Sequence, residues 1–138
     1  MLLLRRIIPL LLLALFGWMA LSTSSRVGVT FDETAHLTAG YSYWSSGEYR
    51  LQPENGNLPQ RLAAIPSLAK DIQAPAWEGE AWTRADVWWF GRELFFHLGN
   101  DTANLLLAGR SMIVLLAVAL VALVYFWSYK LFGHTGGI

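Results

Sequence analysis

Two long apolar stretches frame the chain, and apolar residues recur at helical spacing between them. The first stretch runs from Ile7 to Leu21, and the second runs from Leu105 to Phe132. A membrane-spanning helix needs about 20 mostly apolar residues. The second stretch is long enough and the first lies near the lower limit, so the pattern predicts an all-α membrane protein with two transmembrane helices.

A secretory signal peptide is the alternative interpretation of the first stretch. Arg5 and Arg6 precede the apolar run, and Ala20 to Ser22 offer small residues for cleavage. The apolar run is long for a signal peptide, and Trp18 lies where an interfacial aromatic residue is expected. We therefore expect an uncleaved anchor, although both interpretations place the following segment outside the cytoplasm.

Basic residues at the two ends predict the orientation. Arg5 and Arg6 lie at the start of the first predicted helix and Lys130 lies at the end of the second, which places both ends in the cytoplasm. We expect a first transmembrane helix in residues 1–25, an extracytoplasmic loop in 26–103, a second transmembrane helix in 104–132 and a cytoplasmic end in 133–138. The protein would then be a multi-pass protein of the inner (plasma) membrane, with its loop on the periplasmic or extracytoplasmic side.

The loop is predicted to contain three short amphipathic helices. In the first, Leu37, Tyr41 and Trp44 share a face, and Gly47 ends the helix. The second begins at a capping box made by Asn57 and Gln60 and is limited by Pro66. Its apolar face consists of Leu58, Leu62 and Ile65.

The third helix is predicted to begin between Thr83 and Asp86. Gly99, Asn100 and Asp101 would end it and cap the second transmembrane helix. Its apolar stripe is Val87, Phe90, Leu94 and Leu98, flanked by Trp88 and Trp89. Short helices of this kind between two spans are expected to lie along the bilayer surface as interfacial helices. The alternative interpretation is a small helical cap that buries the same stripes in its own core, because about 80 residues can form a marginal core.

Composition agrees with a membrane location. Hydrophobic residues make up 54% of the chain and charged residues only 14%, against about 25% charged in an average soluble domain. Ten basic and ten acidic residues cancel, so no overall field attracts nucleic acid. The chain has no cysteine, which excludes disulfides, thiolate metal sites and cysteine nucleophiles.

The acidic pair Asp32 and Glu33 is the first candidate for chemistry. A helix that begins near Asp32 places Asp32 and His36 on one face and Glu33 on another, so one carboxylate can face a substrate while the other holds structure. Helix capping is the alternative, because acidic residues are favoured in a first turn. No third ligand at suitable spacing joins Asp32 and His36, so no metal site is assigned.

A polar loop after the first predicted helix is the second candidate. Its density of Pro, Asn and Gly predicts tight turns, and its side chains suit sugar hydroxyls or, for the arginines, a phosphate. Turn formation, or pairing of the arginines with Glu48 and Glu54, is the alternative. The candidate substrate-binding residues are Arg50, Glu54, Asn55, Asn57, Gln60 and Arg61.

Four tryptophans of the loop, Trp77, Trp82, Trp88 and Trp89, have the rings needed to stack on sugars. Interfacial anchoring is the more frequent role of tryptophan near a membrane. Asn100 to Thr102 also matches an N-glycosylation sequon.

Three segments together resemble the first periplasmic loop of GT-C glycosyltransferases. They are DETAHLTAGYSY from Asp32, GEYRLQPE from Gly47 and LPQRLAAIP from Leu58. The resemblance extends from about Phe31 to Arg110 and is closest to the protein O-mannosyltransferase and aminoarabinose transferase branch, the phospholipid carrier-dependent glycosyltransferases. Many relatives have Pro-Glu-His-Pro-Pro where this chain has Asn55 to Asn57 after Pro-Glu, which indicates a subfamily with a different substrate.

The resemblance implies transfer of a sugar from a polyprenyl-phosphate donor to an acceptor hydroxyl with inversion. Asp32 would be the base, Glu33 a supporting or metal-proximal carboxylate and His36 an orienting group. The phosphate leaves without a general acid, so one carboxylate base suffices. Membrane lipids, the polyprenyl-phosphate sugar and an unidentified acceptor are the expected partners. The resemblance leaves room for a divalent metal.

Members of this family are polytopic, so we expect this chain to be the amino-terminal part of a longer enzyme. Two helices lack the walls that enclose a lipid-linked sugar, and the isolated fragment is predicted to be inactive. A non-catalytic two-span accessory or carbohydrate-binding membrane protein is the alternative.

Overall fold

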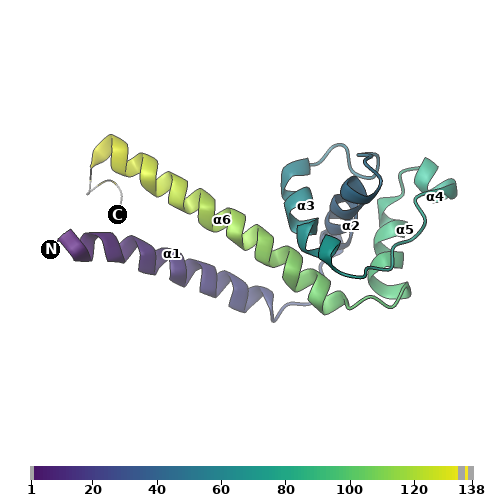
Figure 1. Cartoon of the computed structure of the whole chain (residues 1–138), viewed down its shortest axis with the longest axis horizontal. Helices are drawn as coiled ribbons and strands as arrows, with labels where there is room; N and C mark the ends of the chain where they lie inside the picture. Colours follow the sequence, from purple (N-terminus) through teal and green to yellow (C-terminus); the bar gives the residue numbers. More distant parts are fainter. Residues whose placement is uncertain (1, 134–135, 137–138) are drawn as a thin grey trace. The chain divides into compact units, whose positions relative to one another are not determined.

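The computed structural model describes residues 2–133 and 136, and every regular element among them is a helix. The α-helices are α1 (Leu2–Ser24), α2 (Phe31–Ser45), α3 (Asn57–Ala64), α4 (Gly79–Thr83), α5 (Val87–Arg92) and α6 (Thr102–Phe132). Two single turns extend α3 and α5, the 3₁₀ turn η1 (Ile65–Ala69) and the π turn η2 (Glu93–His97). Figure 1 follows these elements along the chain. The expected all-α class is therefore confirmed.

Two helices are long and apolar enough to cross a membrane. Residues Ile7–Ser24 of α1 have a mean hydropathy of 1.9, and the most apolar 18-residue stretch of α6 has 2.4. Only 6% of each of these two 18-residue stretches is buried within the protein, whereas the core helix of a soluble protein is mostly covered by its own chain. The chain divides into two compact units, residues 1–26 with 114–138, and residues 27–113.

The second unit, residues 27–113, is a small helical cap centred on α2, which lies between α3 and α5 in Figure 1. Gly40 of α2 makes the approach of α3 possible, since a Cβ atom at Gly40 would lie 2.1 Å from the carbonyl oxygen of Gln60. On the other side, a Cβ atom at Gly91 of α5 would lie 3.0 Å from the carbonyl oxygen of Thr34. Backbone therefore packs closely against backbone on both sides of α2.

Two apolar clusters form the core of the cap. The first consists of Ala35, Ala39, Tyr43, Leu51, Trp82, Val87 and Phe90. The second consists of Leu37, Ala64, Leu94, Phe95, Leu105 and Leu106. Val87, Phe90 and Leu94 of the predicted stripe are thus buried within the cap itself, as the packed-cap interpretation expected, whereas Leu98 is only partly buried. Leu58 and Ile65 of α3 and η1 stay exposed.

The helix ends agree in part with the sequence predictions. Gly47 follows α2 with a φ of +75°, and the Asp101 carboxylate caps α6 by accepting the Asn104 amide at 3.0 Å. The predicted capping box at Asn57 was wrong, because Gly56 is the capping residue and the Gln60 side chain turns into the core. The third helix begins after Asp86, which accepts the Trp89 amide, while Thr83 belongs to the separate turn α4.

Candidate active site at the start of helix α2

The first turn of α2 holds the two adjacent carboxylates in different surroundings. Glu33 accepts the backbone amide of Thr30 at 2.8 Å and its hydroxyl at 3.0 Å, so its side chain closes the N-terminus of the helix. Asp32, one residue earlier, is exposed. Within the described part of the chain, no hydrogen bond or ion pair engages the Asp32 carboxylate.

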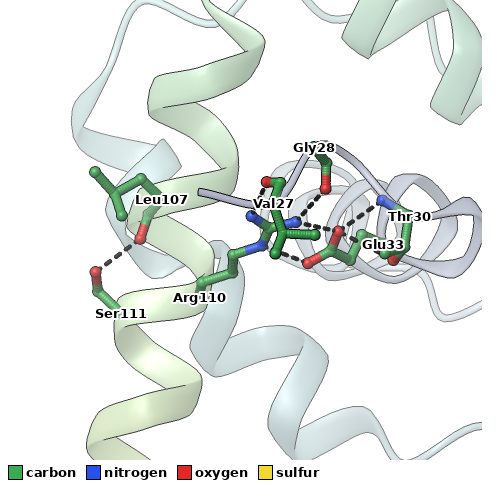
Figure 2. Close-up of polar contacts among 7 residues, drawn as sticks. All are labelled: Val27, Gly28, Thr30, Glu33, Leu107, Arg110 and Ser111. Atoms are coloured by element: carbon green, nitrogen blue, oxygen red, sulfur yellow. Dashed lines mark hydrogen bonds and ion pairs between the residues drawn. The ribbon is translucent and has the colours of Figure 1, made fainter. Parts of the chain in front are cut away.

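Arg110 of α6 locks Glu33 in place, as Figure 2 shows. Its Nε and Nη2 atoms each donate to one Glu33 oxygen at 2.6 Å, which is the bidentate geometry of a strong arginine–carboxylate pair. Nη1 and Nη2 also donate to the carbonyl oxygens of Val27 at 2.7 Å and Gly28 at 2.8 Å. We call this arrangement the Arg110 clamp. It ties the segment before α2, the first turn of α2 and helix α6 to one guanidinium.

The clamp also controls the charge of Glu33. Hydrogen bonds from Arg110 lower the pKa of Glu33 below its ordinary value, the bonds from Thr30 add to this effect, and partial burial opposes it. Glu33 therefore stays ionised and fully occupied as a structural acceptor. Among the two carboxylates, only Asp32 has oxygens free to accept a proton from a substrate.

His36 lies one turn after Asp32 and joins a buried polar network. Its Nδ1 atom lies 2.7 Å from Gln52 Oε1 and 3.0 Å from Gln60 Nε2. The Gln60 amide donates to Gln52 Oε1 at 2.6 Å. The Tyr43 hydroxyl lies 3.0 Å from the Gln52 carbonyl and 2.9 Å from Gln60 Oε1. Both glutamines are buried, so the network fixes the polar loop and α3 against α2.

Burial has a marked effect on the tyrosine in this network. It raises the pKa of Tyr43 to about 12, with a smaller contribution from the nearby charge of Glu54. The hydroxyl stays neutral and keeps its hydrogen bonds throughout the physiological range. Tyr43 and Gln52 were not singled out from the sequence, because neither a tyrosine nor a glutamine in an amphipathic segment signals a buried network.

The arginines of the polar loop lie at the other end of α2. The indole nitrogen of Trp44 donates to the Arg61 carbonyl at 3.0 Å, and Trp44 is twelve residues after Asp32. This separation corresponds to about 18 Å along a helix. Arg50 pairs with Glu48 at 2.8 Å, as the alternative interpretation expected. The structure thus brings Gln60 toward His36 but does not bring the arginines to Asp32.

The remaining loop residues have varied surroundings. The Arg61 guanidinium lies 4.2 Å from the centre of the Trp44 ring and donates to the Tyr49 hydroxyl at 2.8 Å. Glu54 and Asn55 are exposed. The Oδ1 atom of Asn57 is buried and has no hydrogen-bond partner in the described part of the chain.

The tryptophans proposed as sugar platforms have mostly structural surroundings. Trp82 is buried, and Trp77 and Trp89 pack against the first core cluster. Trp88 alone among the four is exposed, and its ring stacks on Phe31 with 4.1 Å between centroids. The sequon asparagine, Asn100, is also engaged, because its amide donates to the carbonyl oxygens of Gln73 and Leu94 at 2.8 Å each.

Metal ligands are sparse in the cap. Across residues 2–133 and 136, no group of three His, Cys, Asp or Glu side chains is placed to hold a metal ion. The residues present around Asp32 and His36 therefore do not form a protein-only metal site, and no step is assigned to a metal here.

Arg110 is the residue whose role the sequence left unassigned. In the sequence it marks only the end of the segment that resembles the first periplasmic loop, and it lies within the second apolar stretch. A charged residue inside such a stretch is a signal of function or of a specific partner, and that signal could have identified the clamp.

Comparisons of the chain with family models, curated proteins and solved structures found no match.

Proposed function

We propose that this chain acts in an integral membrane glycosyltransferase that moves a sugar from a polyprenyl-phosphate donor to an acceptor hydroxyl with inversion. The cap, residues 27–113, would lie on the extracytoplasmic side of the inner membrane. Asp32 would be the catalytic base. The observation that carries the proposal is that the two carboxylates have different contacts. Arg110 holds Glu33, whereas the neighbouring Asp32 is exposed and its carboxylate is free.

The length of α6 supports a position of this site at the membrane surface. The helix has 31 residues, or about 46 Å, whereas the hydrocarbon core of a bilayer is about 30 Å thick. Its buried residues, Leu105, Leu106 and Gly109, all lie in its first third. Residues 111–132 would extend about 33 Å and match the bilayer. Arg110 would then lie where α6 enters the lipid, and the clamp would hold Glu33 and its neighbour Asp32 near that depth.

This depth suits a lipid-linked donor. The phosphate of such a donor lies among the headgroups, and its lipid chain lies in the hydrocarbon core. A base at headgroup depth can remove the proton from an acceptor hydroxyl as that oxygen attacks the anomeric carbon from the face opposite the phosphate. The bond to the phosphate breaks as the new glycosidic bond forms, and the phosphate leaves as an anion that needs no protonation.

The alternative function, a carbohydrate-binding accessory protein, depends on tryptophan platforms. Three of the four candidate rings, Trp77, Trp82 and Trp89, pack in or against the core of the cap, which leaves only Trp88 for contact with a sugar. The packing of these rings therefore favours the transferase over the accessory role.

The test is the substitution Asp32→Asn in the native gene. Membranes from the variant would be supplied with radiolabelled polyprenyl-phosphate mannose and polyprenyl-phosphate aminoarabinose, and label transferred to endogenous acceptor would be measured. Loss of a general base lowers turnover by about 10²- to 10⁴-fold. Glu78→Gln is the matched control, because Glu78 is an exposed acid whose side chain has no hydrogen bond in the described structure. Equal transfer by the Asp32→Asn and Glu78→Gln proteins would exclude the base assignment.

A further inference from the structure

An exposed aromatic pair lies beside Asp32. The Phe31 side chain, one residue before Asp32, is 75% exposed, which is the highest value among the large apolar residues of the cap. It stacks on Trp88 of α5, which is 42% exposed, with an angle of 21° between the two ring planes. Two rings held rigidly in contact with water are unfavourable on a soluble surface, so exposed aromatic patches mark a contact with a partner or a membrane.

A cation accompanies the two rings. Arg92 lies one turn after Trp88 on α5, so the two side chains project from the same face of the helix. Arg92 is exposed, and no carboxylate pairs with it among the residues that the structure describes. The acidic residue nearest to the two rings in the sequence is Asp32, which directly follows Phe31. An aromatic body with an unpaired arginine complements a lipid layer, in which rings lie at the headgroup boundary and guanidinium groups reach the phosphates.

Chain connectivity favours phospholipid as the occupant of this surface. Phe31 belongs to the same first turn of α2 as Glu33, which the clamp fixes to Arg110. Arg110 directly precedes residues 111–132, the part of α6 that would match the bilayer. The clamp therefore connects the turn that carries Phe31 to Arg110, the residue at which the proposed span begins.

We propose that Phe31, Trp88 and Arg92 form a phospholipid-contact surface that seats the cap on the outer leaflet and keeps Asp32 at headgroup depth. We call it the lipid-contact surface. This proposal rests on the membrane placement given under the proposed function. It adds which surface of the cap contacts the lipid.

The absence of cysteine allows a direct test by site-specific spin labelling. Nitroxides would be attached to Trp88→Cys, Arg92→Cys and, as the matched control on the polar loop, Glu54→Cys. The full chain would be placed in nanodiscs of phosphatidylglycerol and phosphatidylcholine that contain no polyprenyl phosphate. Collision rates would be measured with oxygen, which concentrates in lipid, and with a nickel chelate, which stays in water. The helical circular dichroism spectrum of each labelled protein would be compared with that of the unlabelled chain.

The expected result is an oxygen-to-nickel ratio several-fold higher at position 88 than at position 54, with position 92 in between. Arg92→Cys leaves both rings in place, so it reports on the surface even if loss of Trp88 disturbs the stacking. Equal ratios at positions 92 and 54 would show a water-exposed surface. Low collision rates with both reagents would show that protein covers it, either another segment or a second copy. Either result overturns the proposal.

These outcomes are separable from those of the transfer assay. A water-exposed label, together with transfer lost in Asp32→Asn, would reject the lipid-contact surface and keep the base. A lipid-exposed label together with unchanged transfer in Asp32→Asn would keep the lipid-contact surface and reject Asp32 as the base.

Discussion

The Arg110 clamp can be tested through its contribution to stability. Glu33→Gln removes the charge of the acceptor but keeps an amide oxygen that can still close the capping box with Thr30. Arg110→Leu removes the whole guanidinium, including its bonds to the Val27 and Gly28 carbonyls. The double variant completes a thermodynamic cycle, which isolates the interaction between the two side chains from their other contacts.

The magnitude follows from the burial of the pair. The side chains of Arg110 and Glu33 are only 14% and 29% exposed, and both hydrogen bonds are 2.6 Å long. Exposed ion pairs contribute about 0–1 kcal/mol, whereas breaking a buried pair costs about 3–5 kcal/mol. A mostly covered bidentate pair falls between these limits, so we expect a coupling free energy of about 2 kcal/mol. Arg110→Leu should cost more than Glu33→Gln because it also frees two backbone carbonyls.

The assay is reversible denaturation of the full chain in detergent micelles, followed by circular dichroism. The four proteins of the cycle would be compared at pH 7, where both side chains are charged. A coupling free energy below about 0.5 kcal/mol would refute the reasoning, since it is the value of a solvent-exposed pair. Equal destabilisation by both single variants would show that the hydrogen bonds from the guanidinium to the backbone carbonyls do not contribute to the free energy of unfolding.

The same pair predicts a dependence on acid. The pKa of Glu33 is lowered in the folded chain from its ordinary value of 4.5. The folded state therefore binds this proton more weakly than the unfolded state does. The contribution of Glu33 is fully present above pH 4.5 and is lost as the pH falls below that value through the folded pKa. Glu33→Gln should remove this part of the acid dependence, and an unchanged pH profile would contradict the assignment.

Two further predictions concern the packing around α2. Gly40→Ala places a methyl group 2.1 Å from the Gln60 carbonyl oxygen and should destabilise the cap by about 1–3 kcal/mol or more. Gly28→Ala is the control. No atom lies within 4 Å of its new Cβ, so the melting temperature of the cap should stay unchanged. Similar melting temperatures for the two variants would refute the close approach of α3. Tyr43→Phe should cost about 1–2 kcal/mol by leaving the Gln52 carbonyl without its buried donor. The pKa of Tyr43 is raised to about 12, so its contribution is complete below pH 10 and is lost as the pH rises toward 12. Absorbance titration at alkaline pH should show one tyrosine fewer ionising near pH 12 in the variant, and an unchanged titration would contradict the burial of the hydroxyl.

The sequence by itself determined the helical class and some of the helix ends. Apolar runs of about 20 residues can satisfy their backbone only as helices if they enter lipid, which made α1 and α6 predictable. Local signals also sufficed at Gly47, where a positive φ favours glycine, and at Asp101, whose carboxylate reaches a backbone amide three residues away. Such signals act within one turn, so one sequence is enough to read them.

The tertiary structure decided which of the polar residues are free to act. Asp32 and Glu33 are chemically alike in the sequence, and the contact of Glu33 with Arg110, 77 residues further along, adds to its local bonds with Thr30 and separates the two roles. Gln60 looked like a helix cap, but its side chain contributes to a buried network with His36. The local pattern could not reveal these roles, because the partners come together only when the chain folds, and a hydrogen bond between covered groups is stronger than one in water.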